Sequence, residues 1–326
     1  MGVAITGTGS YLPEIKLTNR DMEMMVDTSD EWIITRTGIK ERRICPKGKA
    51  SSDLGVEASL RAIADSGIKK EDIDFIICAT ITADMYFPST ACVIQKKLGL
   101  ENIPAFDFQA ACSGFIYGLE IAKGLILGCG YKNGLVIASE CMSRLTDYTD
   151  RSTCVLLGDG AGAAIISYSK EEGILDSYLA SNGSYGNLLY TPGGGSLKSS
   201  SFEVIEKRMN FMKMEGSTLF KIAIHSMSEA VLKILEKNNL KKEDISLIIP
   251  HQANLRIIAG VAKNLDIPLE KFFINIEKYG NMSAACVPVA LDEAVKSGKI
   301  KKGDLIILVA FGAGLTWASN LIRWVK

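Results

Sequence analysis

The sequence has no excess of one charge and no long apolar run. Lysine plus arginine equals aspartate plus glutamate at 37 each, which argues against a nucleic-acid-binding protein, although a local basic patch is compatible with this balance. No run approaches the roughly 20 apolar residues that a membrane span needs, and residues 1–10 carry no charge ahead of their apolar stretch. We therefore expect a cytoplasmic protein with neither membrane nor nucleic acid as a partner.

Paired cysteine motifs are also absent. None of the eight cysteines forms a C-x-x-C pair, so neither a zinc site nor a disulfide framework is indicated, and no metal is expected. Most should be small buried side chains in a reducing compartment. They are Cys45, Cys78, Cys92, Cys112, Cys129, Cys141, Cys154 and Cys286.

The chain contains two copies of one design. Residues 68–77 (IKKEDIDFII) recur as residues 240–249 (LKKEDISLII), a spacing of 172 residues, and each copy follows an amphipathic helix and enters a short apolar strand. Further pairs follow in the same order: 110–112 with 284–286 (both AAC), 134–138 with 304–309, and 160–162 with 312–314 (both GAG). We infer a duplicated α/β unit divided near residue 170, with halves 1–170 and 171–326.

The apolar patterns of the two copies predict how they pack. Strands such as 73–79, 134–139, 245–250 and 304–310 are continuous apolar runs, so helices should cover both of their faces. Residues 112–127 are apolar nearly all round, which is typical of a helix inside the protein. Two sheets with helices between and outside them satisfy both patterns. Residues 183–217, rich in Gly and Ser, should form a long excursion that covers a site.

Cys112 lies where the predicted strand 104–108 ends and the buried helix begins. Free N–H groups and the positive dipole end at a helix N-terminus lower a thiol pKa and favour the thiolate. A thiolate there is a nucleophile, and its own backbone N–H can face a developing oxyanion. A core cysteine is the alternative that this residue alone leaves open.

Two further residues suit the same chemistry. His251 follows the strand 245–249, at the strand end where α/β sheets place functional residues, whereas His225 lies on a helix and is interpreted as structural. Asn281 opens the second copy's counterpart of the Cys112 helix, so a two-fold axis can bring both helix starts together. Taken alone, His251 could be a core histidine and Asn281 a helix cap. Together with a thiolate they suit acyl transfer, in which an acyl-cysteine forms and a carbanion must be stabilised.

Five motifs spread along the chain closely resemble β-ketoacyl-acyl carrier protein synthase III. They are 30–43 (DEWIITRTGIKERR), 110–114 (AACSG), 158–162 (GDGAG), 251–257 (HQANLRI) and 311–317 (FGAGLTW). The resemblance covers essentially the whole chain. It implies the thiolase fold, a duplicated five-layer αβαβα arrangement, which agrees with the repeat.

The resemblance also implies a reaction and its residues. Cys112 would take an acyl group from acyl-CoA, most simply acetyl-CoA, and malonyl-acyl carrier protein would then enter. His251 and Asn281 would hold the malonyl thioester and stabilise the enolate that forms as carbon dioxide leaves, and the backbone N–H groups of Cys112 and Ala313 would form the oxyanion hole. The product is a 3-oxoacyl-carrier protein that initiates fatty acid synthesis. No cofactor is implied, because the CoA thioester is a substrate.

Binding residues follow from the same motifs. The residues expected to hold CoA are Trp32, Arg36, Arg151 and Asn254. Lys221 and Arg256 should dock the acidic carrier protein, as a local basic patch on a neutral chain. The residues expected around the acyl pocket are Phe87, Leu156, Leu189 and Met212, of which Phe87 would reach across the interface of a homodimer. For the two arginines and Phe87, a surface charge and ordinary packing are the alternatives.

Three residues depart from the family pattern, and three relatives are disfavoured. Met282, Cys286 and Ala313 stand where threonine, serine and glycine are common, yet no catalytic group is lost. A thiolase proper would need a second cysteine as base near the C-terminal Gly-rich turn, an elongating synthase a second histidine, and a hydroxymethylglutaryl-CoA synthase a glutamate beside the Cys112 motif. A specialised-metabolism relative with another primer or acceptor remains the closest rival, and a degenerate scaffold is the non-enzyme alternative.

Overall fold

The apolar runs of the sequence form the buried strands of two stacked sheets. The structure is a computed structural model that describes residues 2–326. The strands are β1 (Gly2–Tyr11), β2 (Ile15–Thr18), β3 (Glu41–Ile44), β4 (Phe75–Ala79), β5 (Ala105–Phe108), β6 (Asn133–Cys141), β7 (Asp159–Ser169), β8 (Ile174–Ser181), β9 (Leu189–Tyr190), β10 (Lys213–Met214), β11 (Leu247–Pro250), β12 (Leu305–Gly312) and β13 (Thr316–Arg323). The helices are α1 (Asn19–Glu23), α2 (Asp30–Thr37), α3 (Ser51–Ser66), α4 (Thr90–Leu98), α5 (Gly114–Cys129), α6 (Arg151–Cys154), α7 (Phe202–Glu206), α8 (Gly216–Lys237), α9 (Leu255–Leu265), α10 (Ile276–Tyr279) and α11 (Cys286–Lys296).

The two large sheets share one topology. The first has the strand order β1-β7-β6-β4-β5, and the second has the order β8-β13-β12-β11. β4 pairs in parallel with both β5 and β6 in the first sheet, and β11 pairs in parallel with β12 in the second, whereas the remaining pairings of both sheets are antiparallel. The second sheet has no full counterpart of β5, because only an isolated bridge joins Ile248 to Phe272 there.

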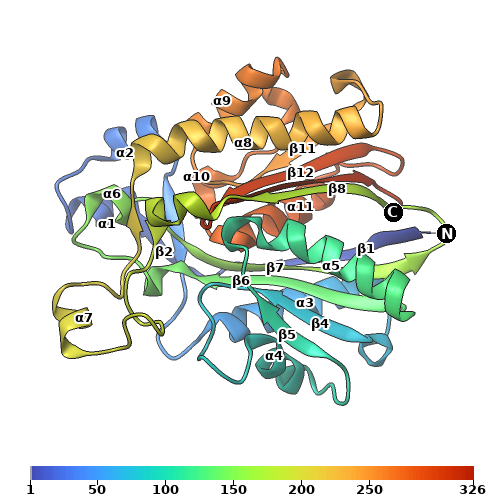
Figure 1. The fold of residues 1–326 in the computed structure, drawn as a ribbon, viewed down its shortest axis with the longest axis horizontal. Helices are drawn as coiled ribbons and strands as arrows, with labels where there is room; N and C mark the ends of the chain where they lie inside the picture. Colours follow the sequence, from blue (N-terminus) through green and yellow to red (C-terminus); the bar gives the residue numbers. More distant parts are fainter. Residues whose placement is uncertain (1) are drawn as a thin grey trace.

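Helices separate and cover the sheets in five layers (Figure 1). Helices α5 and α11 lie between the sheets, α3 and α4 cover the first sheet, and α8 and α9 cover the second. The predicted αβαβα arrangement is confirmed. Burial of the strands on both faces explains why their sequences do not alternate between polar and apolar residues.

The stretch Ala111–Cys129, which joins the first 3₁₀ helix to α5, is long and apolar enough to cross a membrane by length and mean hydropathy alone. Glu120 and Lys123 interrupt it, so it is not the continuous apolar run whose absence the sequence indicated. Half of the stretch is buried, and Phe115, Ile116 and Leu119 pack into the central core between the sheets. The position of α5 is therefore that of a core helix, which passes the same test of length and composition.

The structural repeat keeps a spacing of 172 residues throughout the site region. Two 3₁₀ helices, Ala111–Ser113 and Ser283–Ala285, precede α5 and α11, and their first residues both have positive φ, 45° and 50°. Cys112 is therefore equivalent to Ala284. The predicted pairing of Cys112 with Cys286 was shifted by two residues, because both segments contain the same Ala-Ala-Cys string.

The excursion 183–217 folds over the ends of these helices. It contains a 3₁₀ helix (Gly183–Leu188), the short helix α7, and a two-stranded antiparallel sheet of β9 and β10, which flank α7 in sequence. Leu189 of β9 and Met214 of β10 line the same cavity as Cys112. The excursion therefore covers a site, as its length predicted.

Candidate active site

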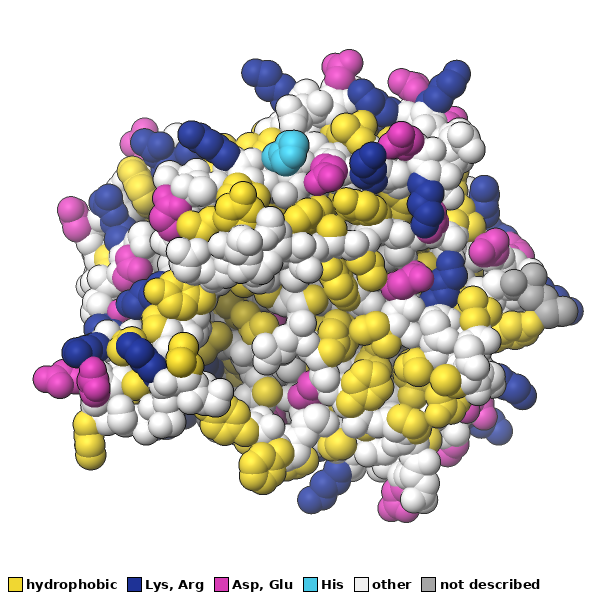
Figure 2. Space-filling view, in the orientation of Figure 1, with side chains coloured by type: hydrophobic (Ala, Val, Ile, Leu, Met, Phe, Trp, Pro, Cys, Tyr) yellow, Lys and Arg dark blue, Asp and Glu magenta, His cyan; other side chains and the backbone are white. Residues whose placement is uncertain are grey.

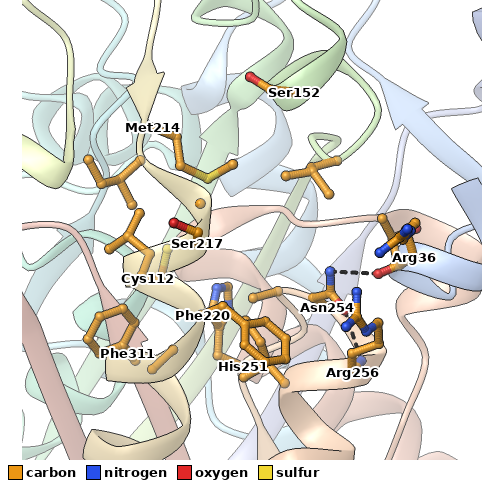
Figure 3. Close-up of a pocket in the computed structure, with 18 of the residues that line it drawn as sticks. Arg36, Cys112, Ser152, Met214, Ser217, Phe220, His251, Asn254, Arg256 and Phe311 are labelled. Carbon is orange, nitrogen blue, oxygen red and sulfur yellow. Dashed lines mark hydrogen bonds between the residues drawn. The ribbon is translucent and has the colours of Figure 1, made fainter. Parts of the chain in front are cut away.

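A cavity of about 510 Å³ opens beside the start of α5 and is lined mainly by α2, α8, α9 and the end of β12. Figure 2 shows a hollow in the surface with a hydrophobic floor. Figure 3 shows Arg36, Asn254 and Arg256 grouped on one side of the cavity and Cys112 and Phe311 on the other. The cavity therefore has a polar, cationic side and a side that carries the thiol.

A second cavity of about 300 Å³ lies on the other side of Cys112. Its side chains are mostly apolar, and Cys112 and Leu189 line both cavities. Its lining residues are Ile81, Gln109, Ala111, Cys112, Met142, Leu145, Leu189, Tyr190, Thr191, Met212, Ser283 and Ala313. A thiol between a cavity with arginines on one side and a smaller apolar cavity is placed to receive an acyl chain from a larger, anionic carrier.

The backbone of Cys112 is held closely against the end of β12. A side chain at Gly312 would place its Cβ 2.6 Å from the amide nitrogen of Cys112, so only glycine allows this approach. Thr316 donates a hydrogen bond to the carbonyl of Ala110 at 2.9 Å, and Ser113 donates to the carbonyl of Thr316 at 3.2 Å. The start of α5 is thus fixed to the second half of the chain.

The Cys112 thiol is neutral in this setting. Its side chain is 9% exposed, and burial raises the pKa of Cys112 to about 12, with a further rise from the charge of Glu140 and an opposing contribution from Ser283. The prediction that the helix N-terminus gives Cys112 a lowered pKa was therefore wrong, because the cost of burying a thiolate exceeds the effect of the helix dipole. The thiol must lose its proton as it reacts.

Glu140 is a carboxyl group buried behind the thiol, and sequence reasoning missed it. Its carboxylate accepts hydrogen bonds from Thr80, the Ile81 amide, Thr82 and the Ser283 hydroxyl, and burial raises the pKa of Glu140 to about 7. The same Ser283 hydroxyl lies 3.6 Å from the Cys112 sulfur. A charged residue inside the apolar run 133–141 was the signal that could have found it.

We expect Glu140→Gln to increase the alkylation rate of Cys112 at pH 8. Because burial raises the pKa of Glu140 only to about 7, its carboxylate is largely ionised at pH 8, where its charge raises the pKa of Cys112; removing the charge therefore increases the thiolate fraction and the alkylation rate at that pH. Below pH 6 both proteins carry a neutral group at this position, and their rates should converge.

Iodoacetamide labelling followed by peptide mass spectrometry measures this rate. Asp292→Asn is the matched control, since Asp292 is another buried carboxylate, hydrogen-bonded to Thr8 and Ser10. Slower labelling of Glu140→Gln at pH 8 would contradict the prediction and show that Glu140 assists deprotonation.

His251 follows β11 directly and faces the larger cavity. Its backbone N–H donates to the carbonyl of Val309 at 2.7 Å, which fixes it to β12. The side chain is 2% exposed, its Nδ1 has no partner among residues 2–326, and burial lowers the pKa of His251 to about 3. The imidazole is therefore neutral at physiological pH and can donate one N–H without carrying a charge.

Asn281 is connected to Cys112 indirectly, through a hydrogen bond with Ser283. It does not line either cavity, but its Oδ1 accepts the amide N–H of Ser283 at 2.8 Å, and Ser283 contacts Cys112. The Asn281 backbone is paired with the 156–158 segment on both sides, through Leu156 at 2.8 Å and Gly158 at 3.0 Å. Because Oδ1 is occupied by a donor, the amide N–H₂ is the group left to face a substrate.

The structure brings three of the four residues predicted to bind CoA to the cavity lining. Trp32, Arg36 and Asn254 line it directly. Asn254 caps α9 by accepting the Arg256 amide N–H at 2.8 Å and donates to the Arg36 carbonyl at 3.0 Å (Figure 3). Arg151 is exposed and does not line the cavity, but its guanidinium carbon lies 4.8 Å from the centre of the Trp32 ring. It holds the indole by a cation–π contact.

The remaining predicted residues are spread more widely. Arg256 lines the larger cavity and stacks on Phe220 at 5.3 Å, whereas Lys221 borders a separate surface depression with His225 and Trp317. Met212 lines the smaller cavity, Leu156 the larger and Leu189 both. Phe87 lines neither cavity and is 84% exposed. Among residues 2–326, no cluster of three histidine, cysteine or carboxylate side chains is arranged to hold a metal.

Comparisons with known proteins agree with this geometry. Residues 106–183 match the family described as 3-oxoacyl-[acyl-carrier-protein (ACP)] synthase III, and residues 235–324 match its C-terminal part. The chain is 54% identical to the beta-ketoacyl-[acyl-carrier-protein] synthase III of Caldanaerobacter subterraneus over all of this chain and 99% of the relative. It is 51% identical to that of Clostridioides difficile over 98% of both chains. The crystal structure of the Aquifex aeolicus synthase III superimposes with a TM-score of 0.92 at 47% identity, covering 99% of this chain and 100% of that one.

Proposed function

The chain belongs to the 3-oxoacyl-[acyl-carrier-protein] synthase III family, and we propose that it joins an acyl-CoA primer, most simply acetyl-CoA, to malonyl-acyl carrier protein. The product is a 3-oxoacyl-acyl carrier protein, which initiates fatty acid synthesis. The observation that carries this proposal is the position of Cys112 between a cation-edged cavity and an apolar cavity, with a neutral histidine on the larger one.

The first step is acyl transfer to Cys112. The sulfur attacks the thioester carbonyl, a bond from Cys112 Sγ to the acyl carbon forms, and the bond from that carbon to the CoA sulfur breaks. The thiol proton ends on the departing CoA sulfur, so the step needs no net proton from solvent. The backbone N–H groups of Cys112 and Ala313 stabilise the oxyanion of the intermediate, and the acyl chain lies in the smaller cavity.

The second step is decarboxylation and condensation. The malonyl thioester accepts hydrogen bonds from the neutral His251 imidazole and the Asn281 amide, which stabilise the enolate formed as the bond to the carboxylate breaks and carbon dioxide leaves. The enolate carbon attacks acyl-Cys112, the carbon–sulfur bond breaks, and Cys112 regains a proton from solvent. A neutral histidine suits this role because it donates a hydrogen bond without protonating the carbanion.

The two halves of the chain divide these tasks. Residues 1–170 supply the nucleophile, and residues 171–326 supply His251 and Asn281. Trp32, Arg36, Asn254 and, through Trp32, Arg151 hold the CoA moiety at the outer side of the larger cavity. The acidic carrier protein docks beside the same opening, on Arg256 and on Lys221 of the adjoining helix α8.

We expect Trp32→Ala to raise the KM for the acyl-CoA about tenfold with little change in kcat. The indole lines the cavity from α2, the helix that also carries Arg36, and Arg36 lies on the side away from Cys112 (Figure 3), so the contact of the indole with CoA should contribute equally to ground state and transition state. Steady-state kinetics with acetyl-CoA at fixed malonyl-carrier protein would measure this change. A loss of kcat with unchanged KM would contradict this role.

We propose a cytoplasmic homodimer in which Phe87 of each subunit serves its partner's site. Met85, Tyr86 and Phe87 are 49%, 82% and 84% exposed on one loop, an unusual run of large apolar side chains on a free surface. A second copy of the chain would cover them and would place Phe87 against an acyl pocket. No cofactor is needed, since CoA arrives as part of a substrate.

Acylation mapping tests the proposal directly. The protein is incubated with a panel of acyl-CoAs, any adduct is located by intact and peptide mass spectrometry, and malonyl-acyl carrier protein is then added, with Cys112→Ser as control. An acetyl adduct on Cys112 that turns over to acetoacetyl-carrier protein supports the initiating synthase. Preference for another acyl group, or an adduct that is not discharged, would indicate a specialised relative. No adduct from any acyl-CoA would overturn the enzymatic role of Cys112.

A further inference from the structure

One buried sulfur connects the two segments that carry His251 and Asn281. Cys286 is the first residue of α11 and is fully buried. Its Sγ lies 3.7 Å from Asn281 Oδ1 and 3.8 Å from the carbonyl oxygen of Gln252, the residue after His251. It also accepts the backbone N–H of Met282 at 3.0 Å. A single atom therefore contacts both polar segments of the proposed decarboxylation site.

These contacts determine the orientation of the Asn281 amide. Its Oδ1 faces two donors, the Ser283 N–H and the Cys286 thiol. Turning the amide over would set its N–H₂ against both donors; it would leave the Ser283 N–H unpaired and leave the single proton of the Cys286 thiol only the Gln252 carbonyl as acceptor. Burial raises the pKa of Cys286 well above its usual value, so the thiol keeps the proton that it donates.

The other side of Cys286 adjoins a rigid strand end. Gln252 donates from Nε2 to the carbonyls of Pro250 and Phe273, and its Oε1 accepts the Asn275 amide, so its own carbonyl has a fixed position. The contact from Cys286 to this carbonyl ties the start of α11 to the residue after His251. The size of the sulfur thereby sets the spacing between His251 and Asn281.

None of the contacts that hold Cys112 involves Cys286. The thiol of Cys112 contacts Ser283, and its backbone is fixed by Gly312 and through Ala110 to Thr316. Cys286 contacts Asn281 and Gln252 directly and is linked to Cys112 only indirectly, through Asn281 and Ser283, so a change at Cys286 should act more strongly on the decarboxylation half of the site.

We propose that Cys286 is a positioning residue for the decarboxylation step, which orients the Asn281 amide and fixes its distance from His251. This inference rests on the proposed function. It predicts that the two half-reactions respond differently to substitution at 286. Acylation of Cys112 should not depend on the residue, whereas release of carbon dioxide from malonyl-carrier protein should.

The two half-reactions can be measured separately on Cys286→Ala and Cys286→Ser. Acylation is followed by intact mass after mixing with acetyl-CoA, and decarboxylation by release of labelled carbon dioxide when malonyl-carrier protein is added to the isolated acyl-enzyme. For Cys286→Ala we expect acylation within about twofold of wild type and decarboxylation reduced at least about tenfold, the scale of one lost supporting contact. Cys286→Ser keeps a donor at the same place and should restore most of the decarboxylation rate.

Cys78→Ala is the matched control, since Cys78 is another fully buried cysteine, on β4, and touches neither Asn281 nor Gln252. If Cys286→Ala does not fold, Cys286→Val keeps the volume without the donor and is compared with Cys286→Ser in its place. Equal loss of both half-reactions, or full decarboxylation in the variant without a donor, would overturn the proposal. A wild-type protein that is not acylated at all would instead overturn the proposed function.

Discussion

Replacing Cys112 with alanine is expected to abolish the acyl-enzyme and reduce condensation at least about 1,000-fold, the scale seen when the nucleophile of a covalent mechanism is removed. Both cavities meet at this thiol, so no neighbouring side chain can take over the acyl group. Cys286, a fully buried thiol nearby, lines neither cavity. Intact mass after incubation with acetyl-CoA and a coupled condensation assay would give both quantities.

The loss of condensation in Cys112→Ala should come from the missing nucleophile and not from a general loss of structure. Decarboxylation of malonyl-carrier protein by Cys112→Ala should continue at a measurable rate, since His251 and Asn281 are unchanged. Thermal unfolding should shift little, because the removed sulfur borders two cavities rather than a packed core. Acetylation of another residue in the variant, at the wild-type rate, would show that Cys112 is not the nucleophile.

Replacing His251 with alanine should reduce condensation by about 100- to 1,000-fold while acylation of Cys112 persists. One donor to a developing oxyanion contributes about this factor. The imidazole is held neutral by burial, with a pKa near 3, so its contribution should stay constant from pH 5 to pH 9 rather than fall as a protonated histidine loses its charge. Single-turnover rates of acylation and of condensation across this pH range test both statements.

His225→Ala is the matched control for this substitution. It removes the only other histidine, which is exposed on α8 at a separate depression. Condensation by His225→Ala should match wild type. If His251→Ala instead abolished acylation and left decarboxylation intact, the histidine would be the base for Cys112 rather than a donor to the malonyl thioester.

Much of the fold was predictable because the chain repeats. The ten-residue copies at 68–77 and 240–249 fall at equivalent places in the two sheets, and the apolar character of 112–127 correctly placed α5 between them. Buried strands and a buried helix are recognised by their apolar composition, which a single sequence shows.

Other features depend on contacts that no local pattern encodes. The pKa of Cys112 was predicted with the wrong sign, because the cost of burial depends on the layers packed around the thiol. The shift of two residues in the Cys112 pairing arose because small residues repeat at both helix starts, and only the positive φ of Ala111 and Ser283 fixes the register. Glu140 and Ser283 are distant from Cys112 in sequence and meet it only through β6 and the second 3₁₀ helix.

The buried, neutral state of Cys112 also affects how the protein survives between turnovers. Peroxide attacks thiolates, and its rate follows thiolate population and exposure. With 9% exposure and a pKa near 12, Cys112 has little of either. An idle molecule short of primer is thus protected from sulfenic acid formation. The full reactivity of the thiol is reached when a bound thioester takes over its proton.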